Sequence, residues 1–266
     1  MTYEWRGKWA LVTGASAGIG QALARELAAG GANLILTARR LERLESFAGE
    51  LRGKFGVQTE VFAADLTQPD APEKIFAFTR ERGLAVQLLV NNAGFGQFGE
   101  VVDVEPQRLL DMVQVNCSAV VHLTRLYLPA MVAKRSGDVL ILASTASFQA
   151  VPYISVYAAT KAFDLLFAEG LAEEMRPHGV RVCALCPGST ESEFHQVAGQ
   201  DHLKFAEKHR ETAEKVARVG LAALAAGKSS VVSGAGNAFG VVAQRLVPRS
   251  LVTRIAAGMF RPSDKT

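Results

Sequence analysis

The chain has 266 residues, of which 49% are hydrophobic and 21% charged, a composition typical of a folded globular protein. Its net charge is only +3, and basic and acidic residues are interleaved over most of the chain, which argues against the concentrated basic patch of a nucleic-acid-binding protein. Three cysteines, an odd number, argue against a disulfide framework. The N-terminus has no apolar signal segment and no run reaches about 18 apolar residues, so we expect a soluble, cytoplasmic protein.

Short apolar runs alternate with longer helical patterns along the chain. The predicted strands are Trp9–Thr13, Asn33–Thr37, Gln58–Ala63, Leu88–Asn91, Asp138–Ala143, Val180–Cys186 and Ser230–Ser233. The predicted helices are Ile19–Ala29, Leu41–Lys54, Pro72–Arg82, Pro106–Lys134, Ser155–Pro177 and Thr212–Ala226. The strands are continuously apolar, as parallel strands buried on both faces are. We predict an α/β fold, with a doubly wound, Rossmann-like sheet of seven parallel strands in three layers, forming a single domain over residues 1–266.

A glycine-rich segment, Thr13–Gly20, follows the first predicted strand and opens the first predicted helix. Glycines allow the backbone to turn sharply and to approach a pyrophosphate, which the free N–H groups of a helix N-terminus attract. Any tight turn between a strand and a helix can also use glycine. The order of strand, glycines and helix nevertheless favours dinucleotide binding.

The second predicted strand is followed by Ala38, Arg39 and Arg40. An acidic residue at this place would bind the ribose hydroxyl of NAD. No carboxylate stands here, and a planar guanidinium suits the 2′-phosphate of NADP. We therefore expect NADP(H) rather than NAD, although the two arginines could instead begin a solvated helix and pair with Glu42 or Glu45.

Tyr157 and Lys161 are four residues apart in a predicted helix and share one face. A free phenol, with a pKa of about 10, is a poor acid or base at neutral pH. A neighbouring ammonium stabilises the phenolate and lowers that pKa, so Tyr157 could donate a proton to a carbonyl oxygen or remove it in the reverse direction. Taken alone, this spacing is common by chance.

Ser144 and Asn116 are two further candidates. Ser144 closes the fifth predicted strand, and ligands meet open parallel sheets at the carboxyl ends of strands. Its hydroxyl could hold the substrate oxygen beside Tyr157, or could cap a turn. Asn116 lies among apolar residues in a long predicted helix, where asparagine is unfavourable. It could hold a water linked to Lys161, or be a satisfied core amide.

These segments together resemble the short-chain dehydrogenase/reductase family, and the match covers almost the whole chain. The resemblance rests on Thr13–Gly20, Asp65-Leu66, Asn91–Gly94, Asn116, Ser144, Tyr157–Lys161 and Pro187-Gly188. It implies that Asn116, Ser144, Tyr157 and Lys161 are the catalytic four.

The resemblance also implies a set of cofactor contacts. They are Gly14, Ser16, Gly18, Ile19, Gly20, Arg39, Arg40, Asp65, Leu66, Asn91, Ala93, Gly94, Tyr157, Lys161, Pro187, Gly188, Thr190 and Ser192. Within this set Asp65 would contact the adenine, and Lys161 would also bind the nicotinamide ribose. Ser192 stands where threonine is more usual but keeps the hydroxyl. Thr190 stands where an apolar residue is commoner, so its contact would be largely through the backbone.

The reaction implied is NADP(H)-dependent transfer of a hydride between nicotinamide and a carbonyl or alcohol carbon of a small molecule. The alternatives are a non-enzymatic, NADP-binding regulatory protein, and an isomerase or dehydratase on the same fold. Phe95, Phe98, Phe148 and Tyr153 flank the motifs and form either an apolar substrate wall or ordinary core. Steroid, acyl-chain, sugar and xenobiotic carbonyls all remain open as substrates.

The C-terminal tail, at about residues 237–266, is basic and amphipathic. Four arginines, Arg245, Arg249, Arg254 and Arg261, alternate there with apolar residues. The tail could meet an anionic membrane or a partner subunit, or pack over its own substrate cleft; we favour packing or oligomer contact. The resemblance implies a homodimer or homotetramer through the predicted helices Pro106–Lys134 and Ser155–Pro177.

Cys183 and Cys186 form a C-x-x-C pattern within a predicted strand. Residues three apart on a strand point to opposite faces, and no second Cys or His pair completes a zinc site. We expect small buried side chains here and no bound metal.

Overall fold

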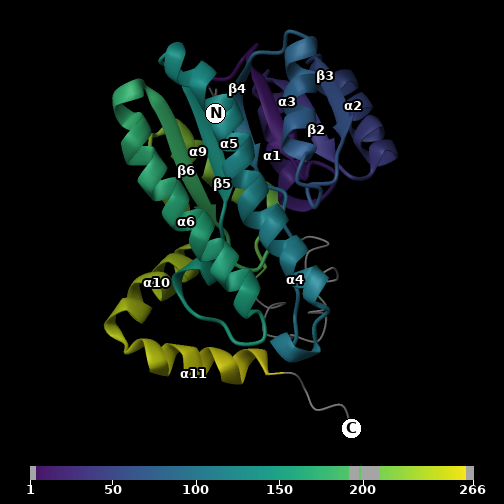
Figure 1. The fold of residues 1–266 in the computed structure, drawn as a ribbon. Coiled ribbons are helices and arrows are strands. Elements are labelled where there is room, and N and C mark those ends of the chain that lie inside the picture. Colours follow the sequence, from purple (N-terminus) through teal and green to yellow (C-terminus); the bar gives the residue numbers. More distant parts are fainter. Residues whose placement is uncertain (1–3, 192–197, 199–209, 262–266) are drawn as a thin grey trace.

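The computed structural model describes residues 4–191, 198 and 210–261, and a single sheet runs through them (Figure 1). Its strands are β1 Trp9–Thr13, β2 Asn33–Ala38, β3 Thr59–Ala63, β4 Val86–Asn91, β5 Gly137–Leu142, β6 Val180–Cys186 and β7 Ser230–Val232. They lie in the order β3-β2-β1-β4-β5-β6-β7, and every neighbouring pair is parallel. The chain first winds outward to β3 and then returns to place β4 beside β1. The predicted doubly wound sheet of seven parallel strands is confirmed.

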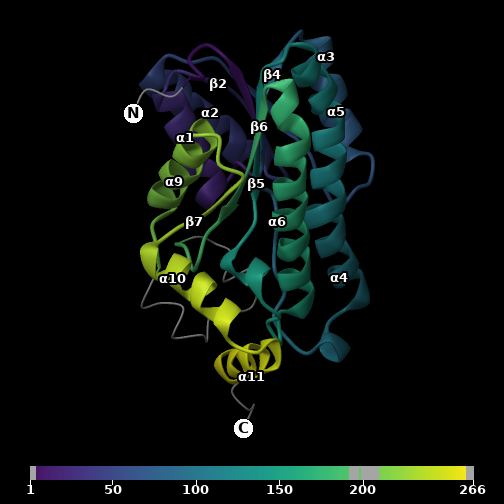
Figure 2. The ribbon, with the colours of Figure 1, turned by 90° about the vertical axis from the view of Figure 1, so that its left-hand side faces the viewer.

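Helices cover both faces of this sheet, which gives three layers (Figure 2). The helices are α1 Gly18–Ala29, α2 Leu41–Phe55, α3 Ala71–Glu81, α4 Pro106–Val113, α5 Ala119–Ala133, α6 Ser155–Met175, α9 Ala213–Ala225, α10 Ala235–Ala243 and α11 Arg249–Phe260. One face carries α1, α2 and α9, and the other carries α3, α4, α5 and α6. The helices of each face therefore pack against their own side of the sheet.

Neighbouring residues of a strand enter the two cores on opposite sides of the sheet. Leu34 and Leu36 of β2 pack with the α1, α2 and α9 side, whereas Ile35 between them packs with the α3, α5 and α6 side. All three are fully buried. Side chains alternate across a strand, and helices cover both faces of this sheet. Every position of such a strand therefore faces an apolar core, and none faces solvent. This is why the strands appear in the sequence as continuous apolar runs.

The same alternation separates the two cysteines of β6. Cys183 belongs to one core and Cys186 to the other, as predicted from their spacing. Both thiols are free, and burial raises the pKa of each to about 12. Within the described ranges, no cluster of three or more His, Cys, Asp or Glu side chains could hold a metal ion.

The predicted single helix Pro106–Lys134 is interrupted. A π-helical segment, Gln114–Ser118, separates α4 from α5. This widened turn carries Asn116, whose side chain is held by backbone outside the helix. Uniform helical periodicity does not reveal such a break, since the apolar stripe continues on both sides of it.

The described part of the C-terminal tail forms two helices, α10 and α11. A turn at Gln244–Leu246 joins α10 to α11, and α11 crosses the end of the molecule beyond the carboxyl ends of the strands (Figures 1 and 2). Its Ala256 is buried against Val151, Ile154 and Ala158. Among the described residues, no helix has the length and apolar character needed to span a membrane.

Candidate active site

A cavity of about 580 Å³ opens where the strands end. Open parallel sheets bind ligands at this edge, near the point where the strand order reverses. The predicted cofactor residues that line it are Gly14, Ser16, Gly18, Ile19, Gly20, Arg39, Arg40, Asp65, Leu66, Ala93, Gly94, Tyr157, Lys161, Pro187, Gly188 and Thr190. Ser144 also lines it, whereas Asn91 and Asn116 do not. Ser192 lies outside the described residues.

The glycine-rich loop forms one wall of the cavity. Gly14 and Gly18 have left-handed backbones, with φ of +66° and +54°. A Cβ at Gly20 would collide with the Gly14 carbonyl oxygen and the Asn92 amide. Helix α1 begins at Gly18, and no described side chain caps its N-terminus. Its first N–H groups therefore face the cavity as donors for an anion.

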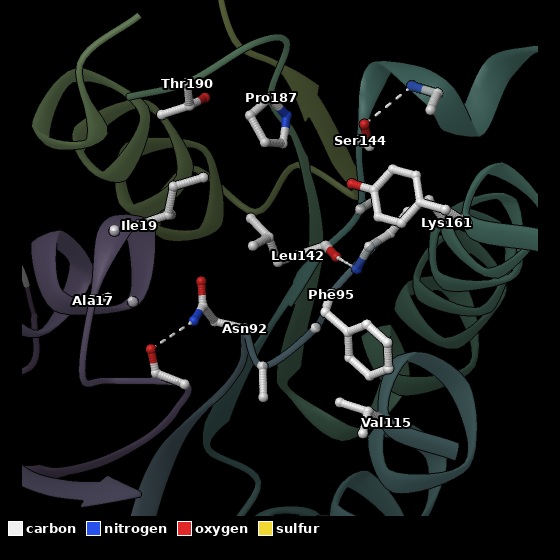
Figure 3. A pocket seen from close by; sticks show the side chains of 18 of the residues that line it. Ala17, Ile19, Asn92, Phe95, Val115, Leu142, Ser144, Lys161, Pro187 and Thr190 are labelled. Atoms are coloured by element: carbon white, nitrogen blue, oxygen red, sulfur yellow. Dashed lines mark hydrogen bonds between the residues drawn. The ribbon is translucent and has the colours of Figure 1, made fainter. Parts of the chain in front are cut away.

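Asn92, which lies in the predicted motif Asn91–Gly94 but was not among the predicted cofactor contacts, anchors this loop to β4. Its amide nitrogen donates to the Thr13 carbonyl oxygen at 2.8 Å and to the Gly14 carbonyl oxygen at 3.3 Å, and Figure 3 draws the second of these bonds. The backbone N–H groups of Asn92 and Ala93 both donate to the Thr13 hydroxyl at 2.9 Å. Asn91 instead points away from the cavity and donates to the Thr124 hydroxyl at 3.0 Å. Asn92 thus lines the cavity and Asn91 does not, and the contact of Asn91 with the cofactor stays a prediction.

The far end of the cavity is cationic. Arg39 and Arg40 are exposed there after β2, and Arg40 donates from Nη2 to the Ser16 hydroxyl at 3.3 Å. Asp65 lies beyond them, where its carboxylate accepts the N–H of Thr67 at 3.1 Å. The end of β2 thus offers two guanidinium groups beside the glycine loop and no carboxylate of its own.

Ser144, Tyr157 and Lys161 meet on the wall opposite the loop. Tyr157 and Lys161 project from one face of α6, and the Tyr157 hydroxyl is hydrogen-bonded to Ser144. Ser144 also accepts the N–H of Ala146 at 3.1 Å and so caps a short turn, so both roles considered for it are compatible. In Figure 3 Ser144 and Lys161 lie across the cavity from Ile19 and Asn92.

Burial dominates the pKa of Tyr157. It raises the pKa above the ordinary 10.0, although Lys161 and the hydrogen bond from Ser144 act in the opposite direction. Lys161 acts to lower the pKa of Tyr157, as predicted. The prediction of a net lowering of this pKa is wrong, because burial raises it more. The phenol therefore remains protonated at neutral pH, which is the form that can donate to a carbonyl oxygen.

Lys161 is held as a buried ammonium. Burial alone would favour the neutral amine, but the Asp164 carboxylate and the remaining contacts outweigh it and place the pKa above 10.5. Its Nζ donates to the Leu142 carbonyl oxygen at 2.6 Å and to Asp164 Oδ2 at 3.0 Å. One of these acceptors comes from β5 and the other from the helix of Lys161 itself, so the amine is fixed from two sides.

Asp164 was also missed by the sequence interpretation. Its side chain is fully buried, and Oδ1 has no hydrogen-bond partner among the described residues. Burial raises its pKa from 3.8 to about 6, against the opposing attraction of Lys161. A carboxylate three residues beyond Lys161 on a helix is a recognisable i,i+3 signal, and it could have been found.

Asn116 lies behind the catalytic wall. Its Oδ1 accepts the Phe95 N–H at 3.1 Å, and its Nδ2 donates to the Phe95 carbonyl and to the Thr160 hydroxyl, both at 3.0 Å. The side-chain amide of Asn116 thus forms its hydrogen bonds within the core, which is the satisfied core amide considered from the sequence. A water held by Asn116 stays a prediction.

The remaining wall is apolar. Phe98 and Phe260 pack around the small cluster formed by Val151, Ile154 and Ala256 next to Tyr157. Met259 and Phe260, at the end of α11, line the cavity itself. Of the other aromatic candidates, Phe95 lines the cavity, Tyr153 lies against Phe98 and Phe148 packs into the main core. The tail therefore covers its own cleft on one face, as one of the three alternatives proposed.

Fold and cavity together define a dinucleotide-binding α/β protein with a Ser-Tyr-Lys constellation. Residues 8–203 match the family described as short chain dehydrogenase, and the chain belongs to this family. The very-long-chain 3-oxoacyl-CoA reductase of Bos taurus is 37% identical over 188 residues, which cover 69% of this chain and 59% of that protein. Its counterpart in Phaeosphaeria nodorum is 36% identical over 181 residues, covering 66% and 53%. The chain thus spans somewhat over half the length of these relatives.

Solved structures match over nearly the whole chain. A short-chain dehydrogenase from Sphingobium yanoikuyae in complex with NADPH has a TM-score of 0.81 and 28% identity, covering 97% of this chain and 98% of the other. A 7beta-hydroxysteroid dehydrogenase has a TM-score of 0.87 and 29% identity, covering 97% and 100%. The overall fold is therefore shared with these dehydrogenases.

Proposed function

We propose that the protein is an NADP(H)-dependent oxidoreductase that transfers a hydride between nicotinamide and a carbonyl or alcohol carbon. One observation carries the proposal: Ser144, Tyr157 and Lys161 face the glycine-rich loop across one cavity. The loop, with its free helix N-terminus, fits a pyrophosphate, and the opposite wall fits a reacting oxygen. A single domain suffices for this reaction, since both walls belong to one sheet and the helices that pack on it.

The side chains of this wall define the proposed proton transfer and the group that stabilises the resulting charge. Ser144 would position the carbonyl oxygen by a hydrogen bond, and the protonated Tyr157 would donate to it. A bound reduced nicotinamide would supply the hydride. The phenolate left behind would be stabilised by the Lys161 ammonium, which Leu142 and Asp164 hold in place. The same groups would act in the reverse sense on an alcohol.

The proposed cofactor is NADP(H) rather than NAD(H). Arg39 and Arg40 stand at the end of β2 with no carboxylate to repel a 2′-phosphate. The NADPH bound to the Sphingobium yanoikuyae relative supports the same choice. The two guanidinium groups would hold the phosphate, and the glycine loop would hold the pyrophosphate.

The proposed substrates are small molecules with an apolar group beside the carbonyl. Phe98, Ile154, Met259 and Phe260 surround the approach to Tyr157. The names of the curated relatives, 3-oxoacyl-CoA reductases, point to an acyl chain as such a group.

We further propose that the chain forms a homodimer or homotetramer through α4, α5 and α6. Apolar side chains are exposed along these helices: Leu110, Val113, Val121, Phe163 and Leu166. Exposed apolar side chains gathered on neighbouring helices are typical of a subunit contact.

The test is NADPH oxidation with a panel of 3-oxoacyl thioesters of increasing chain length, ketones, aldehydes and quinones. Tyr157→Phe should keep its fold and its affinity for NADPH while losing turnover by roughly 10²- to 10⁴-fold, the usual contribution of a positioned acid. Product formed without net oxidation of NADPH would instead identify an isomerase or dehydratase. Binding of NADPH with no turnover of any carbonyl would identify a regulatory protein.

A further inference from the structure

The C-terminal helices leave an apolar and basic surface exposed at the mouth of the cavity. This surface, the C-terminal platform, consists of outward-facing side chains of α10, α11 and the turn between them. Its members are Phe239, Val242, Arg245, Leu246, Arg249, Leu251, Arg254, Ile255, Met259 and Arg261. Phe239 and Leu246 are 76% and 87% exposed, and they stand among further exposed apolar residues of the same two helices.

Helix α11 has two distinct faces. Ala256 is buried against the cluster near Tyr157, and it fixes the helix on the protein. Leu251, Arg254 and Ile255 lie at i, i+3 and i+4 on the opposite face and are exposed. Docking on its own cleft therefore uses only one side of α11, and the outward side is left without a described partner.

The charge of the platform is of one sign. Between residues 235 and 261 the chain contains four arginines and no aspartate or glutamate. All four arginines are exposed, and none forms a salt bridge with a described carboxylate. Some arginines elsewhere do form such salt bridges, as Arg181 does with Asp138 and Arg25 with Glu50.

We propose that the C-terminal platform docks the protein on an anionic lipid surface. Basic side chains next to exposed apolar ones on a short surface helix are the pattern that lies in the headgroup region, with the apolar residues inserted. A second copy of this chain is a poorer occupant, because a two-fold contact would set arginines against arginines without an acid between them. The proposal extends the proposed function but does not depend on it.

The platform also borders the cavity. Met259 is half exposed on the platform, yet it lines the cavity together with Phe260. A lipid surface held against the platform would therefore lie beside the route to Tyr157. An apolar carbonyl compound dissolved in that surface could reach the cavity without crossing water.

The experiment is co-sedimentation of the full chain with vesicles of phosphatidylcholine alone or of phosphatidylcholine with phosphatidylglycerol. The wild-type protein should sediment with the anionic vesicles, and less with the neutral ones. Arg249→Gln with Arg254→Gln should weaken this partition by about 25-fold, since each basic residue near an anionic surface contributes about fivefold. Leu251→Gln with Ile255→Gln should weaken it on both vesicle types.

The matched control is Lys54→Gln with Lys134→Gln, which removes the same charge at the ends of α2 and α5. This pair should leave the partition unchanged, and every variant should still bind NADPH, which shows that it has folded. No sedimentation of the wild type with anionic vesicles would overturn the proposal, as would an equal loss in the control pair. Self-association without vesicles that the platform variants abolish would assign the surface to a second copy instead.

Discussion

Asp164→Asn removes a negative charge from beside Lys161 while keeping the size and shape of the side chain. The pKa of the buried carboxyl is raised from 3.8 to about 6, because burial penalises its charged form more than Lys161 favours it. Between these two values the folded protein binds the proton more tightly than the unfolded chain does. The free energy of unfolding must therefore fall as pH rises through this window.

The magnitude follows from the size of the shift. About two pKa units, at about 1.36 kcal/mol each, give a cost of about 3 kcal/mol for the ionised carboxylate above pH ~7. Asparagine carries no such cost. The variant should therefore be more stable than the wild type by about 3 kcal/mol at pH ~8. This advantage should shrink to less than about 1 kcal/mol by pH ~4, where Asp164 is protonated in the folded protein and only partly ionised in the unfolded chain.

Urea denaturation at pH ~4, ~6 and ~8 measures this difference, and thermal unfolding should show a rise of roughly 6 to 12 °C at the highest pH. Asp138→Asn is the matched control, because Asp138 is also buried but fully engaged. It accepts hydrogen bonds from Trp5 Nε1 at 2.7 Å and from Arg181 Nε at 2.6 Å. Removing that carboxylate should destabilise the protein by about 2 kcal/mol, the opposite sign.

A loss of stability in Asp164→Asn similar to that of Asp138→Asn would refute the reasoning, since Asp164 would then be a net stabilising partner. If the gain is found, the carboxylate is retained at a cost in stability, which is the pattern of functional groups. Asp164 contributes to the raised pKa of both Tyr157 and Lys161. In Asp164→Asn, the loss of carbonyl reduction at alkaline pH should therefore move to lower pH, as a pH–rate profile would reveal.

Three further variants, one of them with a control, test the cavity and the core behind it. Arg40→Ala should raise the Kd of NADPH by roughly 10- to 100-fold and leave that of NADH within about threefold, as measured by calorimetry; equal losses would deny it a role at the 2′-phosphate. Gly20→Ala should abolish dinucleotide binding because its Cβ would meet Gly14, whereas Gly49→Ala, in open space on α2, should bind normally and gain up to about 1 kcal/mol in chemical denaturation. Asn116→Ala should lower the free energy of unfolding by about 2 to 4 kcal/mol; an unchanged urea midpoint would contradict the importance of its buried hydrogen bonds.

The sheet could be predicted because a strand that is buried on both faces appears in the sequence as one continuous apolar run. The bounds of β1 and β6 agree with the prediction, and those of the other strands lie within two residues of it. Helices that pack on one face show a regular period and were located equally well. Both signals are local, so the chain order of the elements, and with it the winding of the sheet, followed from the sequence.

The features that the sequence did not reveal depend on where individual side chains point in the folded structure, which the pattern of apolar and polar residues does not show. Asn91 and Asn92 are adjacent and chemically identical, but the first points to α5 and the second to the glycine loop. Strand alternation separates them only after one face has been assigned to the cavity. The π-helical turn at Asn116 likewise arises from tertiary hydrogen bonds to Phe95 and Thr160, which leave no periodic trace. The tail was ambiguous because its apolar residues serve two opposite faces.

The segment from Asn92 to Phe95 joins the two halves of the cavity. At one end Asn92 holds the glycine loop, and at the other Phe95 is held by Asn116, which in turn binds Thr160 on α6. Between them, a Cβ at Gly94 would lie 3.1 Å from Asn116 Oδ1 and 3.4 Å from Lys161 Nζ, so this backbone passes close to the catalytic wall and a larger residue here would press on Asn116. The separation between the loop and the Tyr157 helix is thus set by a few buried hydrogen bonds after β4. Because each of these bonds ends on backbone or on a buried hydroxyl, the two walls cannot shift independently without leaving a polar group unpaired.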